Sequence, residues 1–193
     1  ALISLTDKTG VVELARALAG MKIQIISTGN TAKVIRESGT DCIEMGEFTG
    51  FPEILGGRVK TLNPKVFGGI LARRDNPSDV AEMNNHDLGS IEIVAVNLYD
   101  FSGAAKNEDA TVQQLIEKID IGGVSLIRAA GKNHKYVTLL TSPSQYPEFL
   151  DRLEKGEIDE DYRAHLAVEG FKLTARYDTL ISGTLEKKIS GEA

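Results

Sequence analysis

The chain has 193 residues, of which 41% are hydrophobic and 26% charged, as in a folded globular protein. Its 22 basic and 28 acidic residues give a net charge of −6, which argues against general nucleic-acid binding because that function needs a basic face. The single cysteine, Cys42, excludes an intrachain disulfide and favours a reducing, cytoplasmic location. We expect neither a signal peptide nor a membrane span, because no run of about 18 apolar residues occurs.

The first half of the chain alternates between short apolar runs and segments with helical periodicity. We predict these elements in chain order: a strand at 1–5, a helix at 11–19, a strand at 21–26, a helix from about 32 to 38 and a strand at 41–45. This repeat of strand, polar turn and helix is typical of an α/β fold with a mainly parallel sheet and crossover helices.

The second half contains one very apolar run, Ile91–Asn97, which we predict to be a buried strand. The apolar run 66–71 fits a strand and a helix equally well. The other predictions, in order, are a helix at 78–85, a loop at 104–110, a helix at 112–119, a break at 120–124, a helix at 125–133, a strand at 136–140 and helices at 145–155 and 159–185, with fraying at 186–188. We interpret 1–193 as one domain, in which 142–193 form a helical extension that covers the sheet or builds a subunit contact.

Two polar turns directly follow the first two predicted strands. The turns at 6–10 and 27–31 both combine hydroxyl groups with a glycine at the start of a helix. Ligands of parallel sheets bind beyond the carboxyl ends of the strands, and a helix start offers N–H groups to a phosphate. Helix capping explains each turn taken alone, but two such turns at one edge favour a phosphate pocket.

A third polar segment, Gly56–Pro64, places Arg58, Lys60 and Thr61 behind two glycines. Arg58 offers a planar fork of donors suited to phosphate, whereas Lys60 offers a point charge on a flexible stem. We hypothesise that this loop binds a phosphorylated anion. Taken alone, a glycine-rich basic loop is more often a solvated turn.

Four further residues could carry chemistry near predicted strand and helix ends. Asn97 ends the predicted strand at 91–97 and could bind a base through its amide, and Tyr99 follows it with a phenol. Alternatively, Asn97 closes a turn and Tyr99 packs in the core. Asp120 and Lys132 flank one predicted helix near Gly122. The ordinary interpretation is that Asp120 caps this helix and that Lys132 is a surface lysine.

Several common site types are excluded by the sequence. The three histidines, His86, His134 and His165, are scattered and lack metal-ligand spacing with Cys42. No nucleophile elbow, dinucleotide fingerprint or P-loop occurs. Chemistry would therefore come from lysine, tyrosine, aspartate and backbone amides, which suit polar reactions at a carbonyl or amidine carbon.

The ordered motifs resemble the inosine monophosphate (IMP) cyclohydrolase family, the amino-terminal part of bifunctional purine biosynthesis enzymes that also carry a formyltransferase. The motifs are Ser4-Leu5-Thr6-Asp7-Lys8-Thr9-Gly10, Ser27-Thr28-Gly29-Asn30-Thr31-Ala32, Thr49-Gly50-Phe51-Pro52-Glu53, Gly57-Arg58-Val59-Lys60-Thr61-Leu62, Asn97-Leu98-Tyr99, Ile119-Asp120-Ile121-Gly122-Gly123, Ala130-Gly131-Lys132-Asn133-His134 and Thr174-Ala175-Arg176-Tyr177-Asp178. The resemblance implies a methylglyoxal-synthase-like three-layer α/β fold and a hydrolase acting on a cyclic amidine in the last step of purine synthesis. It also implies a homodimer that uses no cofactor or metal. By the same resemblance, this chain lacks the formyltransferase domain.

The resemblance also implies roles for individual residues. The substrate would be 5-formamidoimidazole-4-carboxamide ribotide, whose carboxamide nitrogen attacks the formyl carbon with loss of water. The catalytic residues would be Lys60 and Tyr99 at the formyl oxygen, and Asp120 and Lys132 in proton transfer. The substrate-binding residues would be Thr6, Lys8, Ser27, Gly29, Asn30, Thr31 and Arg58 at the phosphate, and Thr61, Asn97, Ile121 and Gly122 at the base.

Five positions depart from the family pattern, and two other functions remain open. The departures are Asn30 for a glycine, Asn63, Phe67 and Leu173 for histidines, and Asp100 for a proline. A methylglyoxal synthase would need the phosphate turns but not the Arg58–Thr61 segment. A regulatory nucleotide-binding module would need the turns but not the four catalytic residues.

Overall fold

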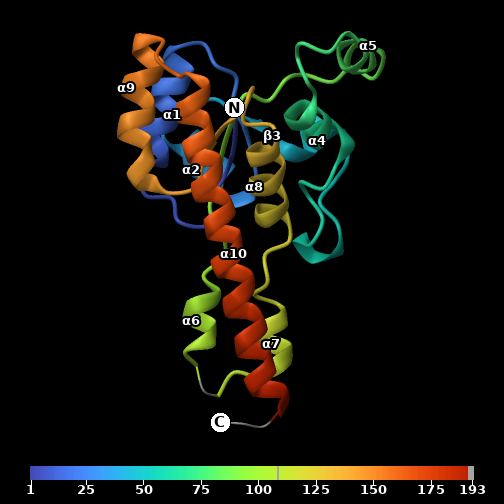
Figure 1. Cartoon of the computed structure of the whole chain (residues 1–193), viewed down its shortest axis with the longest axis vertical. Coiled ribbons are helices and arrows are strands. Elements are labelled where there is room, and N and C mark those ends of the chain that lie inside the picture. The colour runs from blue at the N-terminus through green and yellow to red at the C-terminus, as the bar shows by residue number, and fades with distance from the viewer. Residues whose placement is uncertain (108, 191–193) are drawn as a thin grey trace.

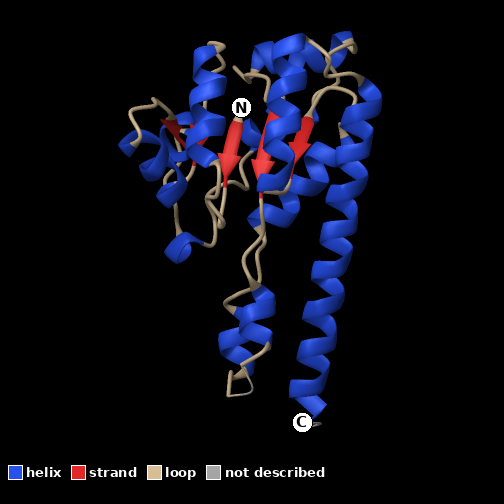
Figure 2. Cartoon of the chain, turned by 90° about the vertical axis from the view of Figure 1, so that its left-hand side faces the viewer, coloured by secondary structure: helices blue, strands red, loops and turns tan. Residues whose placement is uncertain are grey.

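The computed structural model describes residues 1–107 and 109–190 and contains a five-stranded parallel sheet between layers of helices (Figure 1, Figure 2). The strands are β1 Leu2–Ser4, β2 Ile26–Ser27, β3 Ile43–Glu44, β4 Ile93–Val96 and β5 Thr138–Leu140. Their order in the sheet is β3-β2-β1-β4-β5. The central strand β1 pairs with both neighbours, so that Leu2 lies opposite Ile26 and Val94. The predicted α/β fold with a parallel sheet is confirmed.

Helices cover both faces of the sheet. The helices of the described chain are α1 Val11–Gly20, α2 Gly29–Glu37, α3 Met45–Thr49, α4 Pro64–Leu71, α5 Pro77–Asn85, α6 Phe101–Ala105, α7 Val112–Ile116, α8 Gly122–Lys132, α9 Tyr146–Lys155 and α10 Glu160–Ser190, with short 3-10 turns at Leu55–Gly57 and Pro143–Gln145; α6 and α7 lie away from the sheet. Figure 1 shows α1, α2 and α9 on one side of the sheet and α4 and α8 on the other. No described helix is both long and apolar enough to cross a membrane.

Alternating strand residues fill two separate cores. Ile3, Ile93 and Ala95 pack with the cluster around α1 and α9, whereas Leu2 and Val94 pack with the cluster around α4 and α8. Side chains of a strand point alternately to the two faces, so a strand covered on both faces must be apolar throughout. This explains why the run Ile91–Asn97 is so strongly hydrophobic.

Residues 99–107 leave the sheet after β4, and residues 109–119 lead back to it before α8; we call these two segments the arm (Figure 2). Its helices α6 and α7 pack against the distal half of α10. A small core of Phe101, Ala110, Leu115 and Tyr177 joins the arm to α10. Tyr99 begins the arm and Asp120 directly follows it, and the candidate site begins at these two residues.

Several predicted boundaries were wrong for local reasons. The strand expected at 21–26 begins only at Ile26, because the amides of Met21, Lys22 and Ile23 bond to carbonyls at the end of α1. The predicted break at 120–124 contains the start of α8, whose first-turn amide at Gly123 donates to Asp120 Oδ1.

Three further segments also differ from their predicted structures. α3 begins at Met45, inside the strand expected at 41–45, and α6 takes up part of the loop expected at 104–110. α2 starts at Gly29 rather than near residue 32, and α10 continues to Ser190 without fraying at 186–188. The undetermined run 66–71 belongs to α4.

Candidate functional site

The turn after β1 is held by the side chain of Asn97, at the end of β4. Asn97 Oδ1 accepts from the amides of Thr6 at 2.6 Å and Asp7 at 3.1 Å, and its Nδ2 donates to the Asp7 carbonyl at 2.8 Å. Lys8 Nζ donates to the Thr6 carbonyl within the same turn. Asn97 therefore closes a turn between neighbouring strands, the alternative considered for it from sequence, rather than presenting its whole amide to a ligand.

The turn after β2 uses its hydroxyl groups to bind the main chain of β1. Ser27 is fully buried and donates to the Ile3 carbonyl at 2.8 Å, while Thr31 Oγ1 donates to the Leu5 carbonyl at 2.9 Å and accepts from its amide. Neither side chain can turn to a ligand without losing these bonds. The exposed residues of this turn are Gly29 and Asn30, at the first positions of α2.

Helix capping by the side chains does not account for either turn. Thr28 precedes α2 and makes no capping hydrogen bond; its hydroxyl lies 3.0 Å from Ser4 Oγ. Gly10 precedes α1 in a left-handed conformation, and Asp7 bonds to Thr9 instead of to the helix. Within residues 1–107 and 109–190, the amides of Gly29 and Asn30 at the start of α2 make no hydrogen bond, as a phosphate site requires, whereas the first amide of α1, at Val11, bonds to the Lys8 carbonyl.

A pocket of about 350 Å³ joins the β2 turn to the basic loop. Its lining includes Thr28 and Gly29 on one side and Glu53 and Lys60 on the other. Lys60 Nζ lies 3.3 Å from Glu53 Oε2 in a half-buried ion pair. Gly57, with a φ of +92°, lets the loop pass close to Glu53, because a Cβ there would lie 2.7 Å from Glu53 Oε1. The loop thus holds an ammonium group beside a helix start.

Asp120 lies buried where the arm returns to α8. Its Oδ1 accepts from the Gly123 amide at 2.7 Å, and its Oδ2 accepts from the Tyr99 amide at 3.3 Å. Burial raises the pKa of the Asp120 carboxyl, whereas these two amides and the charge of Lys60 act to lower it. A carboxyl group with a raised pKa and a nearby ammonium is a common arrangement for proton transfer.

Small residues bring the basic loop against α8. A Cβ on Gly122 would lie 2.8 Å from Thr61 Oγ1, and a Cβ on Gly123 would lie 2.6 Å from Asp120 Oδ2. Thr61 is buried, whereas Ile121 and Tyr99 are exposed. The structure thus brings together Lys60, Tyr99 and Asp120, to which the resemblance gave catalytic roles, and Thr61 and Gly122, which it placed at the base.

Two predicted site residues lie elsewhere. The Arg58 guanidinium forms an exposed ion pair with Glu117 of the arm, and in the described part of the chain it makes no hydrogen bond to either phosphate turn. Lys132 ends α8 and is exposed, twelve residues after Asp120. At about 1.5 Å of rise per residue the helix separates these residues by roughly 18 Å, so one chain does not bring them together.

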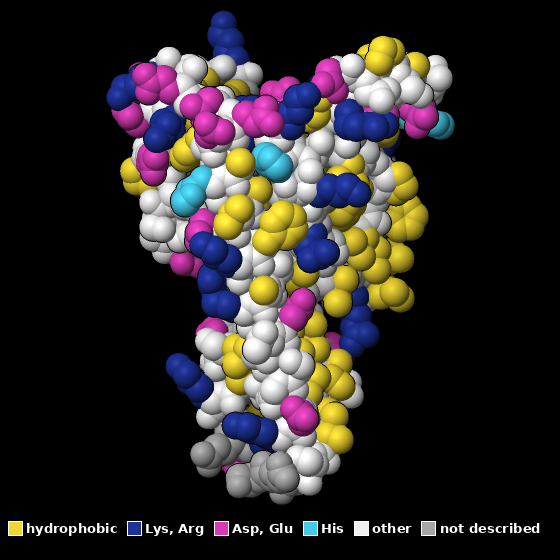
Figure 3. Space-filling model, viewed as in Figure 1, with side chains coloured by type: hydrophobic (Ala, Val, Ile, Leu, Met, Phe, Trp, Pro, Cys, Tyr) yellow, Lys and Arg dark blue, Asp and Glu magenta, His cyan; other side chains and the backbone are white. Residues whose placement is uncertain are grey.

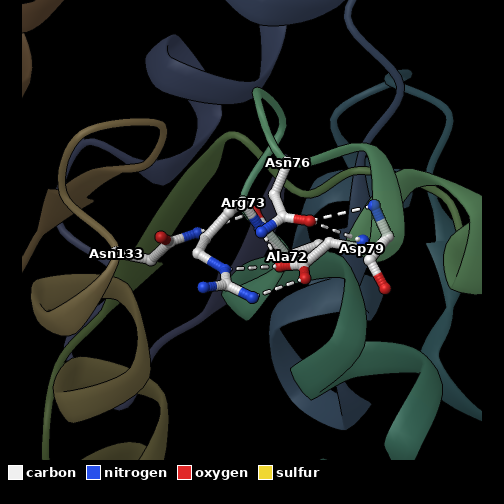
Figure 4. Close-up of polar contacts among 6 residues, drawn as sticks. Ala72, Arg73, Asn76, Asp79 and Asn133 are labelled. Carbon is white, nitrogen blue, oxygen red and sulfur yellow. Dashed lines mark hydrogen bonds and ion pairs between the residues drawn. The ribbon is translucent and has the colours of Figure 1, made fainter.

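The residue after Lys132 has a structural role. Asn133 is buried, and its Nδ2 donates to the carbonyl of Ile70 and to that of Ala72 (the latter in Figure 4), which joins α8 to the end of α4. Next to Ala72, the side chain of Arg73 bonds to both carboxylate oxygens of Asp79. These contacts fix the end of α4, whose first turn follows the basic loop.

Four departures from the family pattern have local explanations. Asn63 caps α4 by accepting from the Lys65 amide, and Asp100 caps α6 by accepting from the Gly103 amide. Phe67 and Leu173 pack against the core around α4 and α8. Two of the substituted residues are good N-caps and two are apolar, so each suits its position in this chain.

Three residues beside the site had no predicted role. Glu53 and Tyr177 stand in the sequence motifs quoted above, and Glu117 lies in the arm. Glu53 pairs with Lys60, Glu117 pairs with Arg58, and the Tyr177 hydroxyl contacts the main chain at Asp120. The motifs could have drawn attention to Glu53 and Tyr177, but the partners of these residues depend on tertiary structure.

Replacing Asn97 by alanine should weaken anion binding. The substitution removes three hydrogen bonds that hold the turn at Thr6, each contributing about 0.5–1.5 kcal/mol. We expect the affinity for inorganic phosphate, measured by calorimetric titration, to fall about tenfold, which corresponds to about 1.4 kcal/mol. Asn85→Ala, at the exposed end of α5, is the control. An unchanged affinity would place the anion away from this turn.

Comparison with known proteins identifies two matching family models. An MGS-like domain matches residues 10–125, and the AICARFT/IMPCHase bienzyme family matches residues 130–193. The chain is 48% identical over 189 residues to the bifunctional purine biosynthesis protein PurH of Persephonella marina, and 47% identical over 194 residues to that of Bacillus mycoides. These alignments cover 97% and 100% of this chain but only 36% and 38% of the relatives, so the chain spans just over a third of their length.

One solved structure is similar over almost the whole chain. The crystal structure of ForH is 30% identical, with a TM-score of 0.87, and the match covers 97% of both chains. The arrangement of strands and helices described above is therefore shared with an experimentally determined protein.

Proposed function

This chain belongs to the family of MGS-like domains, and we propose that it is an IMP cyclohydrolase. The proposed reaction closes the second purine ring of 5-formamidoimidazole-4-carboxamide ribotide and releases water. The observation that carries the proposal is the meeting of Lys60 with the start of α2 in one pocket, next to a buried carboxyl group at Asp120. The match of residues 130–193 to the AICARFT/IMPCHase bienzyme family favours it over other MGS-like functions.

In the proposed binding mode, the ribotide phosphate lies at the turns after β1 and β2. The positive ends of α1 and α2 and the amides of Gly29 and Asn30 favour an anion there, with Lys8 adding a positive charge. Gly29 and Asn30 contact the phosphate through the main chain, since the hydroxyl groups of Ser27 and Thr31 already bind β1. The base extends towards Thr61, Ile121 and Gly122. Arg58 reaches the phosphate only if it leaves Glu117.

The proposed chemistry takes place between Lys60 and Asp120. The carboxamide nitrogen attacks the formyl carbon, and negative charge develops on the formyl oxygen beside the Lys60 ammonium, with the Tyr99 phenol as a second donor. Asp120 is placed to accept the proton of the attacking amide. Asp120 then passes that proton to the oxygen, and the oxygen takes up a second proton, lost by the formamide nitrogen, as the C–O bond breaks, so that water leaves and a C=N bond forms. Glu53 keeps the ammonium in place before the substrate binds.

The association of two copies is a second part of this proposal. Val168 and Phe171 of α10 are exposed, and Figure 3 shows hydrophobic side chains over α10 and α8 on this face. A homodimer would cover these side chains. It could also bring Lys132 of one copy to the other copy's site, since Lys132 does not reach Asp120 of its own chain.

The remaining expectations concern the wider context. We propose that residues 1–193 act as one cyclohydrolase unit with 142–193 as its helical extension, that the natural protein joins it to a formyltransferase, and that it works in the cytoplasm. The word bifunctional in the names of the relatives, and their greater length, support the second of these statements.

The direct test is incubation with the formylated ribotide while the absorbance of IMP is followed. We expect product without added metal or cofactor. Parallel reactions with dihydroxyacetone phosphate test for methylglyoxal synthase activity. Binding of IMP without turnover of either substrate would contradict the proposal and indicate a regulatory nucleotide-binding module.

A further inference from the structure

Tyr177 of α10 contacts the main chain at Lys118 and Asp120, where the arm ends, through its hydroxyl group. The hydroxyl accepts from the Asp120 amide at 2.9 Å and donates to the Lys118 carbonyl at 3.2 Å. Tyr177 is 8% exposed, and the Asp120–Tyr177 bond is buried. One hydroxyl group therefore satisfies a donor and an acceptor on either side of Ile119, where the arm returns to the sheet.

The ring of Tyr177 is fixed independently of this hydroxyl. It packs edge-to-face on Phe101 of α6, with ring centroids 6.2 Å apart and an interplanar angle of 73°. It also belongs to the small core that joins the arm to α10. Because the ring is held by both elements, the position of the hydroxyl is set before it meets Asp120.

The same short segment holds the carboxylate of Asp120. The backbone amide of Asp120 donates to the Tyr177 hydroxyl. Its two carboxylate oxygens accept from the amide of Tyr99, where the arm begins, and from the amide of Gly123, in the first turn of α8. Asp120 therefore has one partner on α10, one after β4 and one on α8. Within residues 1–107 and 109–190, the Tyr177 hydroxyl is the only hydrogen-bond acceptor of the Asp120 amide.

We propose that Tyr177 is a positioning residue for the cyclohydrolase reaction, its hydroxyl group holding the backbone of Asp120 so that the carboxylate faces Lys60 and the substrate. This inference rests on the proposed function. It gives α10 a role in the site, although Tyr177 lies 57 residues after Asp120 and does not itself contact substrate in this proposal.

Tyr177→Phe is the test, because it removes the hydroxyl and keeps the ring. A small displacement of a catalytic group can lower turnover up to about 10²-fold. We expect kcat to fall at least about tenfold with KM changed less than about threefold. Tyr162→Phe is the matched control: Tyr162 lies on the same helix, is also 8% exposed, and its hydroxyl makes no hydrogen bond to residues 1–107 or 109–190.

The pH profile separates positioning from general loosening. The charged group that acts on the Asp120 carboxyl is Lys60, and the titratable Tyr177 interacts with it electrostatically, while Tyr99 contributes its backbone amide. If the carboxylate is held less well by the Tyr99 and Gly123 amides, its pKa rises, so the acidic limb of kcat should move to higher pH in Tyr177→Phe. Ile181→Ala weakens the same arm core without touching the hydroxyl and should leave that limb in place.

Hydrogen exchange at the Asp120 amide gives a readout that does not need activity. We expect faster exchange in Tyr177→Phe than in the wild type and in Tyr162→Phe. If Tyr177→Phe does not fold, difluorotyrosine at position 177, which keeps the hydroxyl but accepts more weakly, should give a smaller loss of kcat in the same direction.

Wild-type kcat, pH profile and Asp120 exchange in a folded Tyr177→Phe, or in the difluorotyrosine protein, would overturn the positioning role. A wild-type chain that makes no IMP would instead refute the proposed function, and the role in catalysis with it. The exchange measurement would then still decide whether the hydroxyl holds Asp120.

Discussion

Lys60→Ala is expected to lower kcat for ring closure by at least about 10²-fold, with a much smaller loss of affinity for IMP. Lys60 is half-buried, lies 3.3 Å from Glu53 and acts electrostatically on Asp120, so its ammonium is already oriented at the pocket. Negative charge on the formyl oxygen is greatest as the ring closes. A donor at that oxygen therefore stabilises the transition state more than the bound ribotide.

The measurement pairs initial rates, from the absorbance of IMP, with the dissociation constant of IMP from titration. Lys33→Ala is the control, since among residues 1–107 and 109–190 Lys33 forms only an exposed i,i+4 pair with Glu37 on α2 and should change neither quantity. Should Lys60→Ala bind IMP far more weakly yet turn over at the wild-type rate, Lys60 would be a ground-state ligand and the oxyanion role would be wrong.

Much of the site could be predicted because strand ends meet at one edge. Once β1, β2 and β4 are recognised as parallel neighbours, the turns at Thr6 and Ser27 and the side chain of Asn97 must converge. Sequence could not assign their hydrogen bonds. Ser27, Thr31 and Asn97 were expected to face a ligand, but in the fold they bind the main chain of neighbouring segments.

The errors have two physical sources. Asp120 and Lys132 were predicted to flank one helix, and the length of α8, Gly122–Lys132, keeps them apart, although the family resemblance gave both residues a role in proton transfer. The second source is long-range packing. Arg58 pairs with Glu117, 59 residues away, and Tyr177 bonds to Asp120, 57 residues away; both contacts depend on how the arm packs, which no local sequence pattern contains.

Asp120→Asn should lower kcat by at least about 10²-fold, as loss of a general base does, while keeping the size of the side chain. In the wild type, kcat should fall on the acidic side as the Asp120 carboxyl becomes protonated. Because burial raises the pKa of Asp120, this limb should lie above the pH at which an exposed aspartate titrates. The variant should lack this limb. Asp41→Asn, an exposed carboxyl before β3, should retain both the limb and the rate.

The same substitution should change how stability depends on pH. The folded-state pKa of Asp120 is above its unfolded value, so ionisation of this group favours the unfolded chain. Its contribution to stability is fully present below the unfolded pKa and is lost as the pH rises through the folded pKa. Asparagine does not ionise, so the free energy of unfolding of Asp120→Asn, relative to the wild type, should increase with pH across this interval. Urea titrations at pH values from 4 to 7 would measure it. A difference that decreases with pH would mean that the Tyr99 and Gly123 amides outweigh burial at Asp120, and that its carboxylate is too weak a base for the proposed proton transfer.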